Sequence, residues 1–138
     1  SPAPANPRSA IERGSMPLDL WIDLMIKKET SGLPETELQR HLMDLRQIQA
    51  GGMIETAFRD VGFAERMGGV LVGGGKVRLE RSLQDAIQIA ELQLKKFAGT
   101  FTQDDADRTE FLKMTTWERA GVKADKRIAD RLKKRGIT

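Results

Sequence analysis

Two short stretches of the chain are nearly alike, and each stands before an amphipathic segment. The sequence IERGS at Ile11–Ser15 is followed, 68 residues later, by RLERS at Arg78–Ser82. Gly32 and Gly99, which follow the two amphipathic segments, are 67 residues apart. Self-similarity at a nearly fixed spacing predicts two copies of one supersecondary unit, neither of which buries its apolar face alone.

Each copy has a short extended run, a helix of roughly four turns, a glycine and a second helix. We expect the two runs to pair as strands above four interlocked helices. The predicted fold is therefore mainly α with a short two-stranded antiparallel ribbon, a tandem ribbon-helix-helix pseudo-dimer in one chain. The alternative is that strand-like stretches precede helices by chance.

The predicted halves cover about residues 9–52 and 76–121 of a single domain, 9–138. Residues 1–8 hold three prolines and are expected to form a flexible leader. A glycine-rich connector and a basic C-terminal helix complete the expected domain. The predicted helices are Pro17–Gly32, Glu35–Gln49, Ile54–Arg66, Leu83–Phe97 and Asp104–Ala120, with Gly51, Gly99 and Gly121 as stops and Thr102 with Asp105 as an acidic capping box.

The composition includes few of the residue types that act as nucleophiles or bases in enzymes. The chain has no cysteine, no tyrosine and one histidine, so disulfides, thiol chemistry and a nucleophile–base pair have almost nothing to draw on. His41 lies near Glu37 and Asp44, but one histidine with helical carboxylates does not indicate a metal site. We expect no enzyme activity, no metal and no cofactor.

The stretch GGVLVGGGK is not a phosphate-binding loop. A Walker motif needs GxxxxGK followed by Ser or Thr. Here Val70 stands where the first glycine belongs, and Val77 follows Lys76. A hinge or hairpin turn before a strand at Val77–Leu79 is the better interpretation.

Positive charge is concentrated at the C-terminal end. Residues 122–138 hold seven basic and two acidic residues, a net +5, whereas the whole chain has +3 and the other 121 residues therefore sum to −2. Such a segment indicates either a partner with phosphates or acidic groups, or a solvated helix. The basic residues that we consider as DNA contacts here are Lys126, Arg127, Arg131, Lys133, Lys134 and Arg135.

A two-stranded ribbon fits the major groove of duplex DNA and can reach base edges. With Val77 and Leu79 buried, Lys76 and Arg78 face outward, and Arg8 is the matching position of the first half. A slip of one residue would expose Arg13 and Arg81 instead, and the sequence leaves this choice open.

The start of each second helix is a further candidate contact, because free N–H groups and hydroxyls bind phosphates there. Thr100 and Thr102 are such candidates, although a plain N-cap accounts for Thr102 equally. We expect Trp21 and Trp117 to pack in the core, and Met25, Met43 and Met114 to lie close to buried stripes.

The overall pattern resembles the family of smaller VirC-operon virulence proteins of Agrobacterium-type T-DNA transfer. The likeness lies in LDLWIDLMIKKETSGLPETELQRHLMDL, GGVLVGGGKVRLERSLQDAIQIAELQLKKFAG and TTWERAGVKADKRIADRLKKRG. It implies a single-chain ribbon-helix-helix protein that binds DNA near the T-DNA border, at the overdrive sequence. It also implies two partners, the relaxase and the ParA-like ATPase of that operon.

The sequence therefore predicts a DNA-binding accessory protein of T-DNA processing. A helical protein–protein adaptor with a basic tail and a ribbon-helix-helix regulator or antitoxin are the alternatives. No apolar run approaches the ~20 residues that cross a bilayer, so we expect no membrane contact. The lack of cysteine fits a reducing cytoplasm, where we expect the protein to be. Since the chain opens SPAPANPRS, without Met, we expect a fragment or a processed product.

Overall fold

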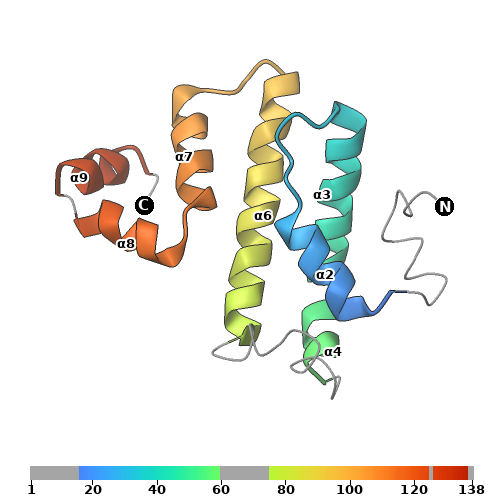
Figure 1. Ribbon diagram of the computed structural model, residues 1–138. Coiled ribbons are helices and arrows are strands. Elements are labelled where there is room, and N and C mark those ends of the chain that lie inside the picture. Colours follow the sequence, from blue (N-terminus) through green and yellow to red (C-terminus); the bar gives the residue numbers. More distant parts are fainter. Residues whose placement is uncertain (1–15, 60–74, 125, 137–138) are drawn as a thin grey trace.

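The structure is a computed structural model that describes residues 16–59, 75–124 and 126–136. All regular structure in these residues is helical (Figure 1). In chain order the helices are α2 (Leu18–Lys27), α3 (Glu35–Ala50), α4 (Met53–Arg59), α6 (Gly75–Phe97), α7 (Gln103–Lys113), α8 (Thr116–Ala124) and α9 (Lys126–Lys134).

The main core lies between α3 and α6, which pack along each other and are covered by α2 and α4 (Figure 1). Apolar side chains three and four residues apart form one stripe on each helix, as a helical period requires. Each fully buried side chain of this kind contributes about 1.5–3 kcal/mol. The core comprises Trp21, Ile22, Met25, Leu38, Leu42, Leu45, Ile48, Ile54, Ala57, Leu79, Leu83, Ile87 and Ala90.

The predicted ribbon is wrong for the second half of the chain. Lys76–Ser82 forms the first turns of α6, and no strand occurs in the ranges that the structure describes. Leu79 is buried at 4% exposure while Val77 is 60% exposed, so the two do not share a face. Leu79 continues the stripe of Leu83 and Ile87, and this long helical period overrides an alternation of only three residues.

The strand expected in the first half, Arg8–Ser15, lies outside the described residues, as does the connector at 60–74. The tandem ribbon-helix-helix pseudo-dimer is therefore contradicted. What replaces it is a helical packing in which the second basic run extends α6 to 23 residues.

Several helix boundaries follow the sequence signals. Gly99 has a φ of 72°, a conformation that side-chain-bearing residues rarely adopt, and it ends α6 as expected. Gly32 also has a positive φ, of 80°, but α2 already ends at Lys27, so the expected stop at Gly32 is wrong. The Thr102 capping box is confirmed: its hydroxyl accepts from the Asp105 N–H at 3.1 Å, and the Asp105 carboxylate accepts from the Thr102 N–H at 2.9 Å.

The expected single helix Asp104–Ala120 is broken. α7 ends at Lys113, and a second capping box starts α8, with Thr115 and Glu118 bonded to each other's backbone N–H at 3.1 Å. Gly121, expected as a stop, lies inside α8. The signal was present in the sequence, since TTWE carries the T-x-x-E pattern of a helix start.

The C-terminal helices α7, α8 and α9 surround a small second cluster, in which Phe111 and Leu132 are buried beside Met114 and Val122. Arg119 of α8 joins this unit to α6. Its guanidinium lies 2.7 Å from the Asp85 carboxylate and donates to the Leu112 carbonyl at 2.8 Å.

The two tryptophans have different environments. Trp21 is 2% exposed, which confirms its predicted core position, whereas Trp117 is 87% exposed on α8 and that prediction is wrong. Met25 is buried as expected, but Met43 is 66% exposed. The break at α8 turns Arg119 and Val122 inward and leaves Trp117 on the outer side of the helix.

Candidate functional site

The expected DNA-contact residues of the second half lie on a helix. Lys76, Arg78 and Arg81 are exposed on the first two turns of α6. The Lys76 amine lies 3.8 Å from the Glu55 carboxylate of α4, so its charge is partly compensated. Arg8 and Arg13 lie outside the described residues.

The two threonines flank the turn between α6 and α7. Thr100 is exposed, and its hydroxyl lies 3.5 Å from the Lys95 carbonyl. The Thr102 hydroxyl is occupied by the capping bond. Lys95 lies 2.8 Å from the Asp105 carboxylate, and their hydrogen bond, with that from Thr102, keeps the Asp105 pKa below its usual value. This end of α7 is thus held by internal contacts.

The second basic group lies on α9, where packing fixes the orientation of the helix. Leu132 is 8% exposed and lies in the cluster of Phe111, while Arg131, Lys133 and Lys134 are exposed. The side chains of Lys126 and Arg127 lie outside what the structure describes.

Arg135 differs from its neighbours because it is tied to α7. It bonds to Asp104 and Asp107, with 2.5 Å to the Asp107 carboxylate. These hydrogen bonds raise the pKa of Arg135 and lower that of Asp107. We therefore assign Arg135 to holding the end of α9 in place rather than to contacting a partner.

The two basic groups are not brought together. In Figure 1 the start of α6 lies at the lower end of the molecule beside α4, whereas α9 lies at the far left beyond α7. Lys76 and Arg78 therefore do not form one continuous surface with the basic residues of α9.

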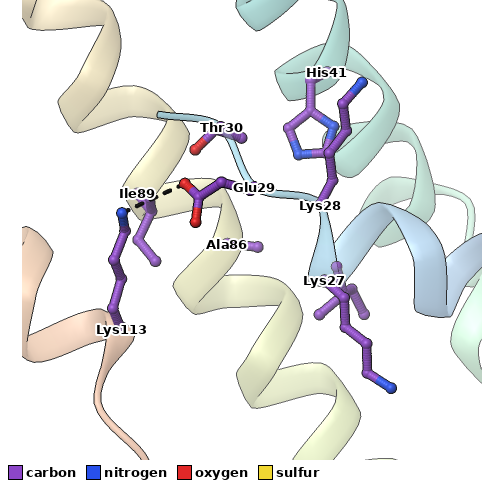
Figure 2. Close-up of a pocket in the computed structure, with 9 residues that line it drawn as sticks. Lys27, Lys28, Glu29, Thr30, His41, Ala86, Ile89 and Lys113 are labelled. Carbon is purple, nitrogen blue, oxygen red and sulfur yellow. Dashed lines mark ion pairs between the residues drawn. The ribbon is translucent and has the colours of Figure 1, made fainter. Parts of the chain in front are cut away.

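A pocket of about 310 Å³ opens between the segment that follows α2 and helices α3, α6 and α7 (Figure 2). The polar residues that line it are Lys27, Lys28, Glu29, Thr30, His41 and Lys113. Sequence reasoning missed this site because its residues come from four separate parts of the chain.

His41 is buried, with 3% exposure, although its neighbours in sequence on α3 are charged and polar. Burial lowers its pKa to about 4, and the positive charge of Lys28 adds to this effect. The imidazole is therefore neutral at pH 7. Its Nδ1 atom has no hydrogen-bond partner among the described residues.

Glu29 lies between His41 and Lys113, and its carboxylate points toward Lys113 (Figure 2). Its carboxylate accepts from the Ser31 N–H at 2.8 Å and lies 3.6 Å from the Lys113 amine. The Ser31 bonds and the Lys113 charge lower the Glu29 pKa to about 2. The carboxylate is thus ionised and already paired.

In the ranges that the structure describes, no group of three or more His, Asp or Glu residues could hold a metal ion. In the same ranges, no helix is both long and apolar enough to cross a bilayer.

Comparison with protein-family models, with curated proteins and with solved structures gives no match to this chain. The resemblance to the VirC-type family rests on the sequence pattern alone and stays a prediction.

Proposed function

We propose that this protein binds duplex DNA as an accessory, without catalysing a reaction, and that α9 makes the principal phosphate contacts. The observation that carries the proposal is the fixed orientation of α9. Leu132 is anchored in the second cluster, and Arg131, Lys133 and Lys134 remain exposed. An oriented group of cations on a nearly neutral body favours a polyanionic partner.

The dimensions of α9 suit this role. Nine residues span roughly 13 Å. An α-helix is roughly 10–12 Å in diameter with its side chains, so α9 fits the major groove, which is roughly 12 Å wide, or lies across one phosphate backbone. The affinity would come mainly from releasing counterions from the DNA, so it would fall as salt rises.

Arg78 and Arg81 offer a second exposed group at the start of α6. Because they lie on a helix and not in a paired ribbon, we expect them to contact phosphates rather than read bases. Arg78→Ala should then weaken binding to all duplexes alike, in contrast to the loss of preference that a base-reading ribbon would give.

A salt titration tests the proposal. Arg131, Lys133 and Lys134 are changed together to Gln, and binding to a duplex of random sequence is measured at several salt concentrations. Loss of each phosphate contact reduces the slope of log K against log salt by about 0.9, so we expect a reduction of about 2–3 for the triple variant.

The matched control changes Arg40, Arg46 and Lys96 to Gln, which removes the same net charge from α3 and α6. These side chains are exposed and lie on other helices. We expect the control to keep most of the wild-type slope. Equal losses in both triple variants, or no loss in the α9 variant, would reject α9 as the DNA contact.

A role at the T-DNA border is the more specific form of the proposal and comes from the resemblance. It is tested by competition between a duplex that contains the overdrive sequence and a random duplex of equal length. A preference for overdrive would support it. The relaxase and the ParA-like ATPase as partners, and a cytoplasmic location, are proposed from the same resemblance. Equal competition would leave a DNA-binding protein without that role.

A protein–protein adaptor is the second candidate, and Trp117 favours it. A tryptophan with 87% exposure is a typical anchor of a protein interface. Trp117→Ala discriminates between the two functions. An adaptor would lose its acidic partner in this variant, whereas a protein that binds duplex DNA through α9 would keep its DNA affinity.

A further inference from the structure

The pocket beside His41 has the size and position of a small-molecule site. Its volume of about 310 Å³ lies at the lower end of the range of roughly 300–1,000 Å³ for ligand pockets. It lies where the N-terminal helices meet α7, between residues that the fold brings together from far apart in the sequence (Figure 2).

The polar groups around the pocket are unevenly satisfied. The Lys27 amine is 3.0 Å from the Asp23 carboxylate, and Lys113 pairs with Glu29 at 3.6 Å. Lys28 has no carboxylate partner in the described part of the chain, so its positive charge is the one left uncompensated at this pocket.

His41 adds a second unsatisfied group. A polar side chain that is 97% buried normally has a hydrogen-bond partner, because an unpaired polar group costs about 1–3 kcal/mol. Its Nδ1 has none among the described residues, and its ring lies beside Lys28 at the pocket (Figure 2). Thr30, 5% exposed, contributes a hydroxyl from the neighbouring segment.

We propose that this pocket binds a small molecule through a phosphate group, with Lys28 supplying the charge and His41 and Thr30 supplying hydrogen bonds. Phosphate suits the arrangement because its oxygens point in several directions and can meet donors from three sides, whereas a planar carboxylate matches a fork such as that of arginine. The remaining volume accommodates the rest of the molecule.

Glu29 lowers the affinity of the pocket for anions. Its ionised carboxylate lies at the pocket and opposes an anion there, although Lys113 and the Ser31 N–H compensate part of its charge. Glu29→Gln removes this opposition while it keeps the side-chain length. Phosphate binding should therefore become several-fold tighter in that variant.

The single histidine of the chain makes the test direct. The ring-proton signals of His41 are followed by NMR at neutral pH, at constant ionic strength, while inorganic phosphate replaces chloride. We expect a saturable shift for the wild-type protein. Lys28→Gln should weaken phosphate binding by about tenfold, the effect of one charge-assisted hydrogen bond.

Lys96→Gln is the matched control, since Lys96 is an exposed lysine whose amine lies over the Phe101 ring, away from the pocket. It should bind phosphate as the wild type does. The proposal is overturned if no saturable shift occurs, if Lys28→Gln and Lys96→Gln bind equally, or if acetate binds as tightly as phosphate. The titration contains no DNA, so its outcome is separate from that of the α9 proposal.

Discussion

His41 is the clearest case of a residue whose role depends on its surroundings rather than on its neighbours in sequence. Flanked by Arg40 and close to Glu37 and Asp44, it reads as a helix-surface residue. The packing of the segment after α2 covers it instead, and burial with the Lys28 charge lowers its pKa to about 4. The sequence around His41 gives no sign that the segment after α2 covers this side chain.

The depressed pKa makes stability depend on pH. The unfolded chain takes up a proton at His41 below its ordinary pKa of 6.5, while the folded protein does not until about pH 4. Stability from this source is therefore complete above pH 6.5 and falls as the pH decreases toward 4, by at most about 3 kcal/mol.

Urea unfolding at a series of pH values measures this loss, and His41→Gln provides the comparison. The variant cannot titrate at this position, so its stability should decline less between pH 6.5 and 4. Parallel curves for the two proteins would mean that the pKa of His41 is the same in the folded and unfolded chain, which would contradict its lowered pKa in the fold.

Among the helices, α8 shows how a short capping signal can outweigh a longer pattern. The apolar positions from Phe111 to Trp117 suggested one continuous helix. The Thr115–Glu118 box provides partners for the first N–H groups of a new helix, which a continuous helix would not need. The break creates the surface that carries Trp117.

Thr115→Ala should therefore destabilise α8 by about 1 kcal/mol, the usual cost of losing a side-chain cap. Thr116→Ala is the control, since Thr116 is exposed and begins α8, while Thr115 provides the cap. Hydrogen exchange of the α8 amides measures the effect. Equal exchange in both variants would exclude the capping box as the determinant of the boundary.

The elements also show how much the sequence could predict. The helices at α2, α3 and the main part of α6, the glycine stops after α3 and α6 and the Thr102 cap follow local signals and are confirmed, whereas α2 ends at Lys27, before the expected stop at Gly32. The prediction of a ribbon was wrong because an alternation of only three residues, Val77–Leu79, is a weaker signal than an apolar stripe that runs along four turns of a helix. The pocket could not be predicted, because it depends on how α7 docks against the segment after α2.

In the whole molecule, Arg119 links the helices around the second apolar cluster to α6 of the main core. Its side chain is 20% exposed, pairs with Asp85 of α6, and lies 5.2 Å from the centre of the Phe111 ring. The Lys95–Asp105 pair and the Lys113–Glu29 pair add polar links between the same two parts. The second cluster is small, so these polar links contribute a large share of its attachment.

Arg119→Met should destabilise the protein by about 2 kcal/mol, because it leaves Asp85 and the Leu112 carbonyl without their partner. Arg46→Met is the control, since Arg46 and Glu91 are 3.7 Å apart and both well exposed, and its cost should be below about 1 kcal/mol. Urea unfolding measures both. Equal costs would mean that Arg119 does not join the two clusters.

The unequal surroundings of Trp21 and Trp117 also give the chain its own optical reporter. Water reaches the indole on α8 and relaxes its excited state, whereas the Trp21 indole, on the buried face of α2, is shielded by the core. Long-wavelength emission therefore comes from the helix next to α9, and an aqueous quencher removes it selectively. A nucleic acid or protein that docks beside α8 and covers Trp117 should therefore change the wavelength or the quenching of its emission, so binding can be followed without a label.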